Sequence, residues 1–351
     1  MQNKSKKDKR KPTDIIYQTK KGPQTDFEFE YIENIIFKNI IHNNHFNEGR
    51  YNLTIENSII IYSCDELKPS VDLINYLNKI NSYSLFHLSN EYQQHLSKYY
   101  KKAKIVFRTA SWDIFSALDN VYTLPLGFQS GFYNDKPFYT NETDNPKERE
   151  YIWGFIGQIK NDRKKMVDAL ASITPNYIHC STSWMSNDTL TPNETIEIYK
   201  KIIFIPSPFG NINFECFRTM EALEWGCIPV TTMFLGRDCY RYIYGDHPFI
   251  VGKDWEDCAS QVTSLINNPR LLEEKQRQVK TWYVNFRTNL ALDIEAILSD
   301  KPENINSQQF QYQRELRKDY YFKLRFFLKF YLVQNIKRIF IKIKSRFNYD
   351  K

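Results

Sequence analysis

An arginine and a glutamate three residues apart, Arg218 and Glu221, are the pair in this sequence best suited to binding a nucleotide. At this spacing two helical side chains lie on neighbouring positions and can enter one cleft. The guanidinium is a permanent forked cation that suits a diphosphate, and the carboxylate can accept hydrogen bonds from a ribose diol. Near a helix N-terminus, free backbone N–H groups would favour the same anion. The alternative is an ordinary ion pair on a helix surface.

The residues around this pair predict a strand, a turn, a helix and a second strand. The apolar run 202–205 is typical of a buried parallel strand, and Pro208 and Gly210 lie in the turn that ends it. From Asn213 onward apolar side chains recur at helical spacing, and Gly226 is the expected C-cap. This order of elements predicts a phosphosugar site.

A second stretch upstream has the same character. Residues 151–156 read as a strand, Gly157 would let the backbone come close to a ligand, and residues 162–170 read as the following helix. Arg163 would then lie near a helix N-terminus and face a phosphate. Alternatively, Gly157 serves only a tight turn and Arg163 pairs with Asp162.

Together these stretches resemble the nucleotide-sugar signature of exostosin-like glycosyltransferases of family 47. There, a strand ending in Pro and Gly precedes Arg, then Glu-Ala, then Gly-x-Ile-Pro-Val. The ribitol-phosphate xylosyltransferase branch is the most similar, since its Asn-x-Glu-Cys-Tyr-Arg resembles residues 213–218. The resemblance spans about residues 83–235 and implies a nucleotide-sugar site made by Gly157, Arg163, Pro208, Gly210, Asn213, Glu215, Arg218 and Glu221.

The acceptor side has its own matching segments. Residues 85–91, LFHLSNE, resemble the family's strand that ends His-Leu-Ser-Asp-Glu, with Asn90 in place of the usual Asp. Glu91 is therefore the predicted general base, because an ionised carboxylate there could take a proton from an acceptor hydroxyl. His87 is the rival, since imidazole titrates near neutral pH. The alternatives are a cap or surface charge for Glu91 and a core histidine for His87.

The elements that must position these residues alternate between strand and helix through both halves of the chain. At 351 residues, with 42% hydrophobic and 16% aromatic content, the chain can bury two cores. The alternation predicts an α/β fold, and the resemblance makes it GT-B: two Rossmann-like domains with a cleft between them and a C-terminal helical tail. The expected boundaries are a basic disordered tail at 1–21, an acceptor-side domain at 22–145, a nucleotide-sugar domain at 146–300 and basic amphipathic helices at 301–351.

The charge of +7 is concentrated at the ends. Residues 1–21 carry a net +6 and residues 320–351 a net +8, which leaves 22–319 at −7. A nucleic-acid enzyme would place basic groups along its folded groove, so we expect no nucleic-acid partner. The C-terminal tail mixes Lys and Arg with bulky apolar residues at helical spacing, which predicts an interfacial helix on an anionic membrane surface. The alternative is a helix that packs back over the N-terminal domain.

The cysteine and histidine patterns indicate a chain without a metal site or a cofactor. Six cysteines are widely spaced without Cys-x-x-Cys, which is typical of free thiols in a cytosolic protein. No Asp-x-Asp or ligand-like His spacing occurs, so cationic side chains must neutralise the leaving diphosphate. Residues 1–12 contain no apolar signal segment. We therefore expect a cytoplasmic protein, with the inner face of a membrane as a further location.

These observations predict an inverting glycosyltransferase. It would move a sugar from a nucleotide-sugar, with UDP as the expected nucleotide, to a hydroxyl of a surface-glycan or polyol-phosphate acceptor. The donor is a substrate, so no cofactor is implied. The alternative is a non-catalytic nucleotide-sugar or glycan-binding protein on the same fold, which the Asn90 departure keeps open.

Overall fold

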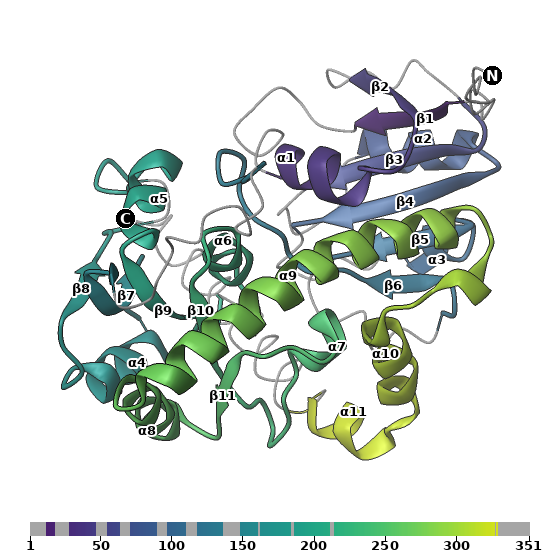
Figure 1. The fold of residues 1–351 in the computed structure, drawn as a ribbon. Coiled ribbons are helices and arrows are strands. Elements are labelled where there is room, and N and C mark those ends of the chain that lie inside the picture. Colours follow the sequence, from purple (N-terminus) through teal and green to yellow (C-terminus); the bar gives the residue numbers. More distant parts are fainter. Residues whose placement is uncertain are drawn as a thin grey trace, which may run out of the picture.

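The computed structural model describes residues 12–17, 28–46, 55–63, 71–89, 97–109, 118–135, 148–160, 162–183, 186–210, 214–326 and 328. Within this part of the chain, two parallel β-sheets with flanking helices form two domains, joined by a long helix that runs across both (Figure 1). The predicted α/β class is confirmed. None of the described helices is long and apolar enough to cross a membrane.

The N-terminal sheet has the strand order β2-β1-β3-β4-β5-β6, and all its pairs are parallel. Every residue of β4 is buried, as expected for a parallel strand covered on both faces. The bounds of the strands and helices are β1 Thr13–Tyr17, α1 Phe29–Tyr31, the π-helix η1 Ile32–Ile36, β2 His42–Phe46, β3 Ser58–Ser63, α2 Val71–Lys79, β4 Tyr83–Leu88, α3 Ser97–Tyr100, β5 Ile105–Arg108 and β6 Val121–Thr123.

The basic tail expected at residues 1–21 is shorter than that range, because β1 lies inside it. Ile15, Ile16 and Tyr17 are buried between β2 and β3. This apolar run is short and follows a lysine-rich stretch. The average composition of residues 1–21 is therefore basic and polar, although the segment contains a core strand. Residues 1–11 lie outside the described part of the chain.

The C-terminal sheet has the strand order β11-β10-β9-β7-β8, again with all pairs parallel. The predicted strand 151–156 and helix 162–170 are found at those bounds. The elements are β7 Tyr151–Ile156, α4 Asp162–Leu170, β8 Asn176–His179, α5 Pro192–Tyr199, β9 Ile202–Pro206, α6 Arg218–Glu224, β10 Ile228–Thr232, α7 Arg241–Tyr244, β11 Ile250–Gly252 and α8 Trp255–Ile266.

One predicted helix begins later than expected. The apolar spacing placed its start at Asn213, which is not described, but residues 214–217 are not helical and α6 begins at Arg218. The apolar side chain of Phe214, at helical spacing from Phe217, instead packs against Phe234 and Tyr240 as part of a loop. The expected C-cap is confirmed, because Gly226 has φ +70° just past the end of α6.

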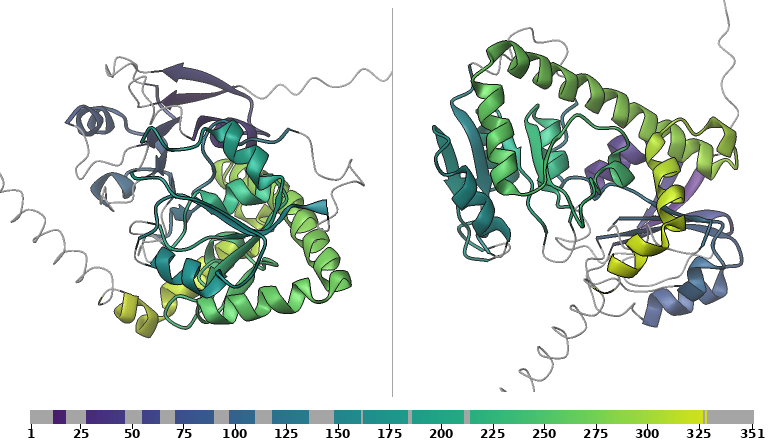
Figure 2. Two further views of the ribbon diagram at one scale, coloured as in Figure 1. Left: turned by 90° about the vertical axis from the view of Figure 1, so that its left-hand side faces the viewer. Right: turned by 90° about the horizontal axis from the view of Figure 1, so that it is seen from below.

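Helix α9, Pro269–Leu298, joins the two domains. Its 30 residues make it about 45 Å long, enough to run from α8 and β10 in one domain to η1 in the other (Figure 2). A short 3₁₀ turn, Pro302–Asn304, leads to α10, Gln308–Lys318, and α11, Tyr320–Phe326. Helix α10 packs on α7 and β6, so the chain returns to the N-terminal sheet after it has completed the C-terminal one.

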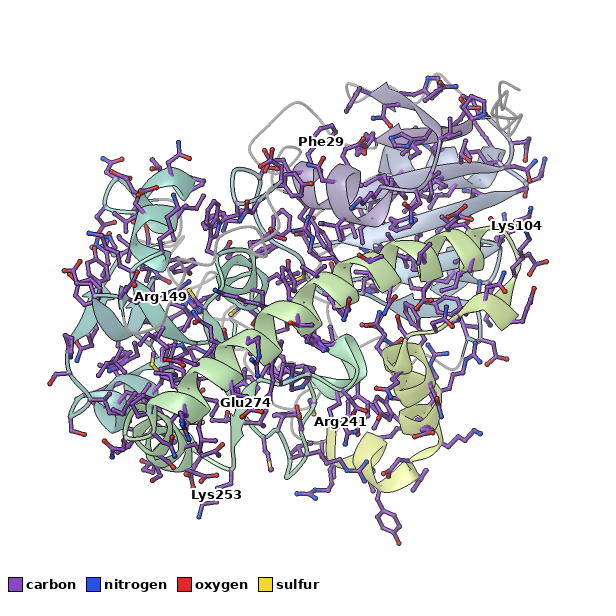
Figure 3. All side chains as sticks on the ribbon, viewed as in Figure 1. Phe29, Lys104, Arg149, Arg241, Lys253 and Glu274 are labelled. Carbon is purple, nitrogen blue, oxygen red and sulfur yellow. The ribbon has the colours of Figure 1, made fainter. Side chains whose placement is uncertain are left out.

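The hydrophobic core is continuous between the domains. Phe86 and Phe107 of the N-terminal sheet belong to the same buried cluster as Trp153 and Phe204 of the C-terminal sheet. Polar links reinforce the C-terminal half: Arg149, labelled in Figure 3, donates to the carbonyl oxygens of Tyr199 at 3.3 Å and Trp225 at 3.1 Å, at the ends of α5 and α6. The two domains therefore share one buried core. The domain boundary expected between residues 145 and 146 falls within residues 136–147, which lie outside the described residues.

Candidate functional site

The carboxyl ends of β7 and β9 bring the two predicted donor motifs to one edge of the sheet. These strands are direct neighbours, with Trp153 paired to Phe204. Gly157 follows β7, and the turn with Pro208 and Gly210 follows β9. Ligands of open α/β sheets bind at this edge.

Arg218 is the first residue of α6, and its side chain contacts the end of β7. Its Nη2 donates to the carbonyl oxygen of Ile156 at 2.8 Å, and its guanidinium carbon lies 4.6 Å from the centre of the Phe155 ring. Gly157, with φ +137°, is so close that a Cβ there would lie 3.0 Å from the same Nη2. The Nε of Arg218 is buried without a hydrogen-bond partner among the described residues. The guanidinium is thus fixed in place with a donor still to satisfy.

Arg163 connects the turn after β7 to the turn after β9. Its Nε lies 3.4 Å from the carbonyl oxygen of Phe209, and its Nη1 donates to that of Gln158 at 3.2 Å. The alternative of a simple pair with Asp162 is not what the structure shows, since Asp162 accepts a hydrogen bond from the Trp255 indole at 3.1 Å. Both predicted donor-site arginines therefore lie at the same sheet edge.

Glu221 is buried one helical turn after Arg218. Its carboxylate accepts a hydrogen bond from the backbone N–H of Gln129, and its Oε1 has no partner among the described residues. Burial raises the pKa of Glu221 to about 7, against the opposing effect of the Arg218 charge. Arg218 and Glu221 thus have different hydrogen-bond partners. They do not form the surface ion pair given above as the alternative.

Glu215 is buried and accepts two hydrogen bonds from groups outside the motif. Its Oε1 accepts hydrogen bonds from the Leu126 N–H at 2.9 Å and the Tyr244 hydroxyl at 2.6 Å. Burial raises the pKa of Glu215 to about 7, and these hydrogen bonds oppose the rise. Leu126 lies in the N-terminal half of the chain, so Glu215 connects the predicted donor motif to the other domain.

Four carboxylates share this kind of contact, all with the segment of residues 124–135, named here the crossover loop. Besides Leu126 with Glu215 and Gln129 with Glu221, the N–H of Gly131 donates to Glu30 at 2.7 Å and that of Asn134 to Glu224 at 3.1 Å. The sequence analysis placed this loop in the acceptor-side domain, residues 22–145, and did not identify its partners. The only available signal was the acidic residues themselves, whose spacing does not show that they face a distant backbone.

Of the two predicted catalytic residues, His87 is described and lies on β4 of the N-terminal sheet. Glu91 lies outside the described residues, as do Asn90 and Asn213. His87 is fully buried on β4, where its Nδ1 lies 2.6 Å from the Tyr100 hydroxyl and 3.2 Å from Nη1 of Arg108. These contacts favour the alternative of a core histidine for His87. The identity of the base stays a prediction.

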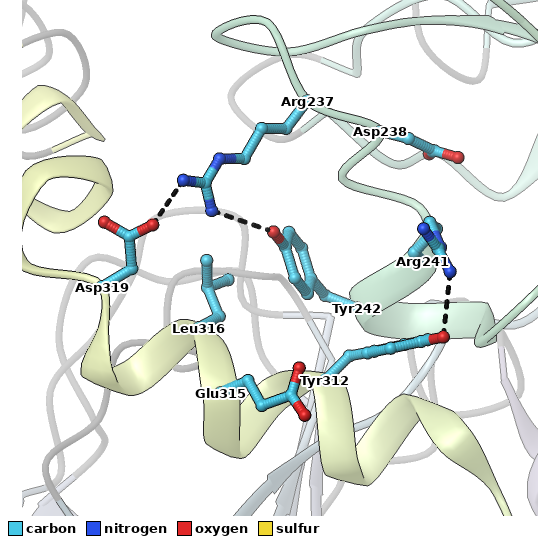
Figure 4. A pocket seen from close by; sticks show the side chains of 8 residues that line it. All are labelled: Arg237, Asp238, Arg241, Tyr242, Tyr312, Glu315, Leu316 and Asp319. Carbon is cyan, nitrogen blue, oxygen red and sulfur yellow. Dashed lines mark hydrogen bonds and ion pairs between the residues drawn. The ribbon is translucent and has the colours of Figure 1, made fainter.

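A cavity of about 480 Å³ lies away from all of these residues, between the loop around α7 and helix α10 (Figure 4). Its cations already have partners: Arg237 forms an ion pair with Asp319, and Arg241 donates to the Tyr312 hydroxyl at 2.9 Å. None of the predicted donor residues lines it. We therefore assign the candidate donor site to the strand ends and not to this cavity.

In the described part of the chain, no group of three or more His, Cys, Asp or Glu side chains is placed to hold a metal ion.

Two facing parallel α/β domains define the GT-B fold, and similarity to solved structures agrees with it. A crystal structure of an α1,3-fucosyltransferase aligns with a TM-score of 0.51 at 12% identity, over 85% of this chain and 92% of that one. A structure of α1,3-fucosyltransferase with GDP aligns with a TM-score of 0.51 at 11% identity. The predicted GT-B fold is confirmed.

Sequence similarity gives a narrower relationship. Residues 133–302 match the family model of the RXYLT1 C-terminal domain. Ribitol-5-phosphate xylosyltransferase 1 of Danio rerio is 23% identical over 195 residues, 49% of this chain and 43% of that protein. Its Homo sapiens counterpart is 23% identical over 175 residues, 43% of this chain and 38% of that protein. The matches thus span less than half the length of these curated relatives.

These matches confirm the resemblance to exostosin-like glycosyltransferases and to their ribitol-phosphate xylosyltransferase branch. By fold and by sequence similarity, the chain therefore resembles glycosyltransferases.

Proposed function

We propose that this protein transfers a sugar from a nucleotide-sugar to an acceptor hydroxyl. The observation that carries the proposal is the meeting of Gly157, Arg163 and Arg218 at the ends of β7 and β9. Two fixed guanidinium groups at the carboxyl edge of a parallel sheet can neutralise a leaving diphosphate. Glycine at position 157 lets the diphosphate approach the backbone.

The donor is proposed to be a UDP-sugar. Arg218 would donate to the diphosphate through the Nε that the described residues leave unpaired, and the unpaired Oε1 of Glu221 would accept from a ribose hydroxyl. The burial of Glu221 strengthens this polar contact, because water competes less for it. The choice of uridine rests on the family resemblance.

The acceptor is proposed to be a hydroxyl of a surface glycan or a polyol phosphate. Glu91, or His87 in its place, would take the proton of that hydroxyl as it attacks the anomeric carbon, and the configuration would invert. The positive charge of the tails further supports a protein that acts at the inner face of a membrane, where a lipid-linked acceptor would be assembled. These details rest on the sequence motifs and the charge distribution.

A non-catalytic nucleotide-sugar-binding protein is the second candidate. Asn90 favours it, because an amide stands where the family has an acid, and an amide cannot act as a general base. Purified protein with a panel of nucleotide-sugars separates the two. An enzyme releases nucleoside diphosphate slowly even without acceptor, whereas a binding protein shows only thermal stabilisation.

The proposal is tested by Arg218→Ala, with Arg241→Ala as the matched control. Loss of a charge-assisted contact costs roughly 1.5–3 kcal/mol, which weakens UDP binding by about tenfold or more. Arg241 also packs on an aromatic ring, Tyr312, but lies at the separate cavity, so its loss should leave UDP affinity unchanged. Wild-type UDP affinity in folded Arg218→Ala protein would overturn the assignment.

A further inference from the structure

Helix α11 presents an apolar stripe to solvent. Tyr320 is 72% exposed, Tyr321 79%, Leu324 43% and, just beyond the helix, Leu328 50%. At about 100° per residue these four positions fall within one arc of about 100°. A core-facing stripe of a helix has this width, yet here all four side chains are exposed.

Basic residues flank the stripe on both sides. By the same helical geometry Lys323 lies about 60° before Tyr320, and Arg325 lies about 40° beyond Tyr321. Lys318 precedes the helix and is exposed. The sequence after the stripe adds further Lys and Arg, so residues 320–351 carry a net +8. An apolar stripe with a cation on each side is complementary to a surface with hydrocarbon under anionic headgroups.

Helix α11 follows α10, and α10 is hydrogen-bonded to both domains. The Gln313 side chain on α10 accepts from the Thr123 N–H at 3.0 Å and donates to the Thr123 and Tyr242 carbonyl oxygens, both at 2.8 Å. Asp319, immediately before α11, forms an ion pair with Arg237 (Figure 4). These contacts fix where α11 leaves the body, at the outer edge of the molecule in Figure 1.

We propose that this face of α11 docks on an anionic lipid bilayer. Tyr320 and Tyr321 would lie at headgroup level, where tyrosine is favoured because one end of the ring is apolar and the other is wet. Leu324 and Leu328 would reach the acyl boundary, and Lys323 and Arg325 would contact lipid phosphates. The inference rests on the membrane location proposed above and identifies the surface responsible for it. It does not require that the transfer chemistry be correct.

The test is co-sedimentation of the full chain with vesicles of phosphatidylcholine, alone or mixed with phosphatidylglycerol. The intact protein should pellet with the mixed vesicles and less so at high salt, because screening shortens the reach of its charges. The double variant Tyr320→Ser, Tyr321→Ser should bind at least about tenfold more weakly. Leu271→Ser is the matched control: it removes a 48% exposed apolar side chain from α9, at the other end of the molecule, and should bind as the intact chain does.

Three results would overturn the proposal. The intact chain could stay in the supernatant with the mixed vesicles. The double serine variant could pellet as strongly as the intact chain, which would assign attachment to residues beyond α11. Sedimentation without lipid could show a dimer that the serine substitutions abolish, which would make the stripe an interface between copies.

Thermal stabilisation by UDP serves as the fold control and separates this inference from the proposed function. The serine variants should keep whatever stabilisation the intact chain shows. Should no nucleotide stabilise any form while vesicle binding follows the predicted pattern, the donor-site proposal fails and the docking surface stands. For a variant that loses stability, Lys323→Glu with Arg325→Glu provides a second test, since these substitutions leave the apolar stripe intact and should abolish the preference for anionic vesicles.

Discussion

Arg218 and Gly157 are in such close contact that a Cβ at position 157 would lie 3.0 Å from Nη2 of Arg218. The two residues are 61 positions apart in the sequence and belong to different motifs. Their contact fixes the guanidinium over the end of β7, where its Nη2 bonds to Ile156. The geometry of the candidate donor site therefore depends on a residue without a side chain.

Gly157→Ala is predicted to weaken nucleotide binding. Alanine at φ +137° is strained, at a cost of about 1–3 kcal/mol, and its methyl group displaces the Arg218 guanidinium. Gly236→Ala is the matched control, because Gly236 also has positive φ, +77°, but its added Cβ meets nothing within 4 Å. Calorimetric titration with UDP should show a loss of about tenfold for Gly157→Ala alone. Equal UDP affinity in the two variants would contradict the proposed role of the contact.

Glu221→Gln is predicted to reduce the selectivity for ribose. The unpaired Oε1 of Glu221 is proposed to accept from a ribose hydroxyl, and a carboxylate acceptor is stronger than an amide. The wild-type protein should bind UDP more tightly than 2′-deoxy-UDP, and the variant should lose most of that preference. Pyrophosphate affinity should stay the same in both proteins. An unchanged preference in the variant would remove Glu221 from the nucleoside contact.

Glu91→Gln is predicted to lower turnover by about 10²–10⁴ with donor affinity unchanged, as expected for the loss of a general base. The measurement is nucleotide release with a saturating donor, beside UDP affinity. His87→Gln should instead lower thermal stability, because it disturbs buried contacts with Tyr100 and Arg108. If Glu91→Gln keeps full turnover and folded His87→Gln loses it, the base is His87.

The free energy of unfolding is predicted to fall as pH rises from about 5 to 8. The pKa values of buried Glu215, Glu221 and Glu224 are each raised from 4.5 to about 7. A raised pKa means that the folded state binds protons more tightly, so this stabilisation is present below about pH 4.5 and is lost as pH rises through about 7. Each group accounts for up to about 3 kcal/mol across that window. Urea unfolding at several pH values measures the slope.

Glu215→Gln is the control for this pH effect. Its amide oxygen can still accept from Leu126 and Tyr244, so the variant imitates the protonated acid and should show a flatter profile with higher stability at pH 8. A profile as steep as that of the wild type would exclude Glu215 as a contributor.

The sequence by itself determined the class of fold and the donor motifs. Strands β4 and β7 and helix α4 follow from local apolar patterns, because a buried parallel strand and an amphipathic helix each have a distinct periodicity. Strand β1 was missed, since its apolar run is short and lies in a basic segment. The start of α6 was placed too early, because Phe214 has helical spacing but packs within a loop.

Only the tertiary structure decided how the motifs act together. The pairing of β7 with β9 brings Gly157 to Arg218, and the return of the chain through α9 and α10 determines which face of α11 stays exposed. The same holds for Glu215, whose partner Leu126 is 89 residues away. Local periodicity reports which face of an element is apolar, but a contact between distant residues depends on the packing of the whole chain. A buried carboxylate that bonds to a backbone N–H leaves no trace in the pattern of side chains, because every residue except proline carries that same donor.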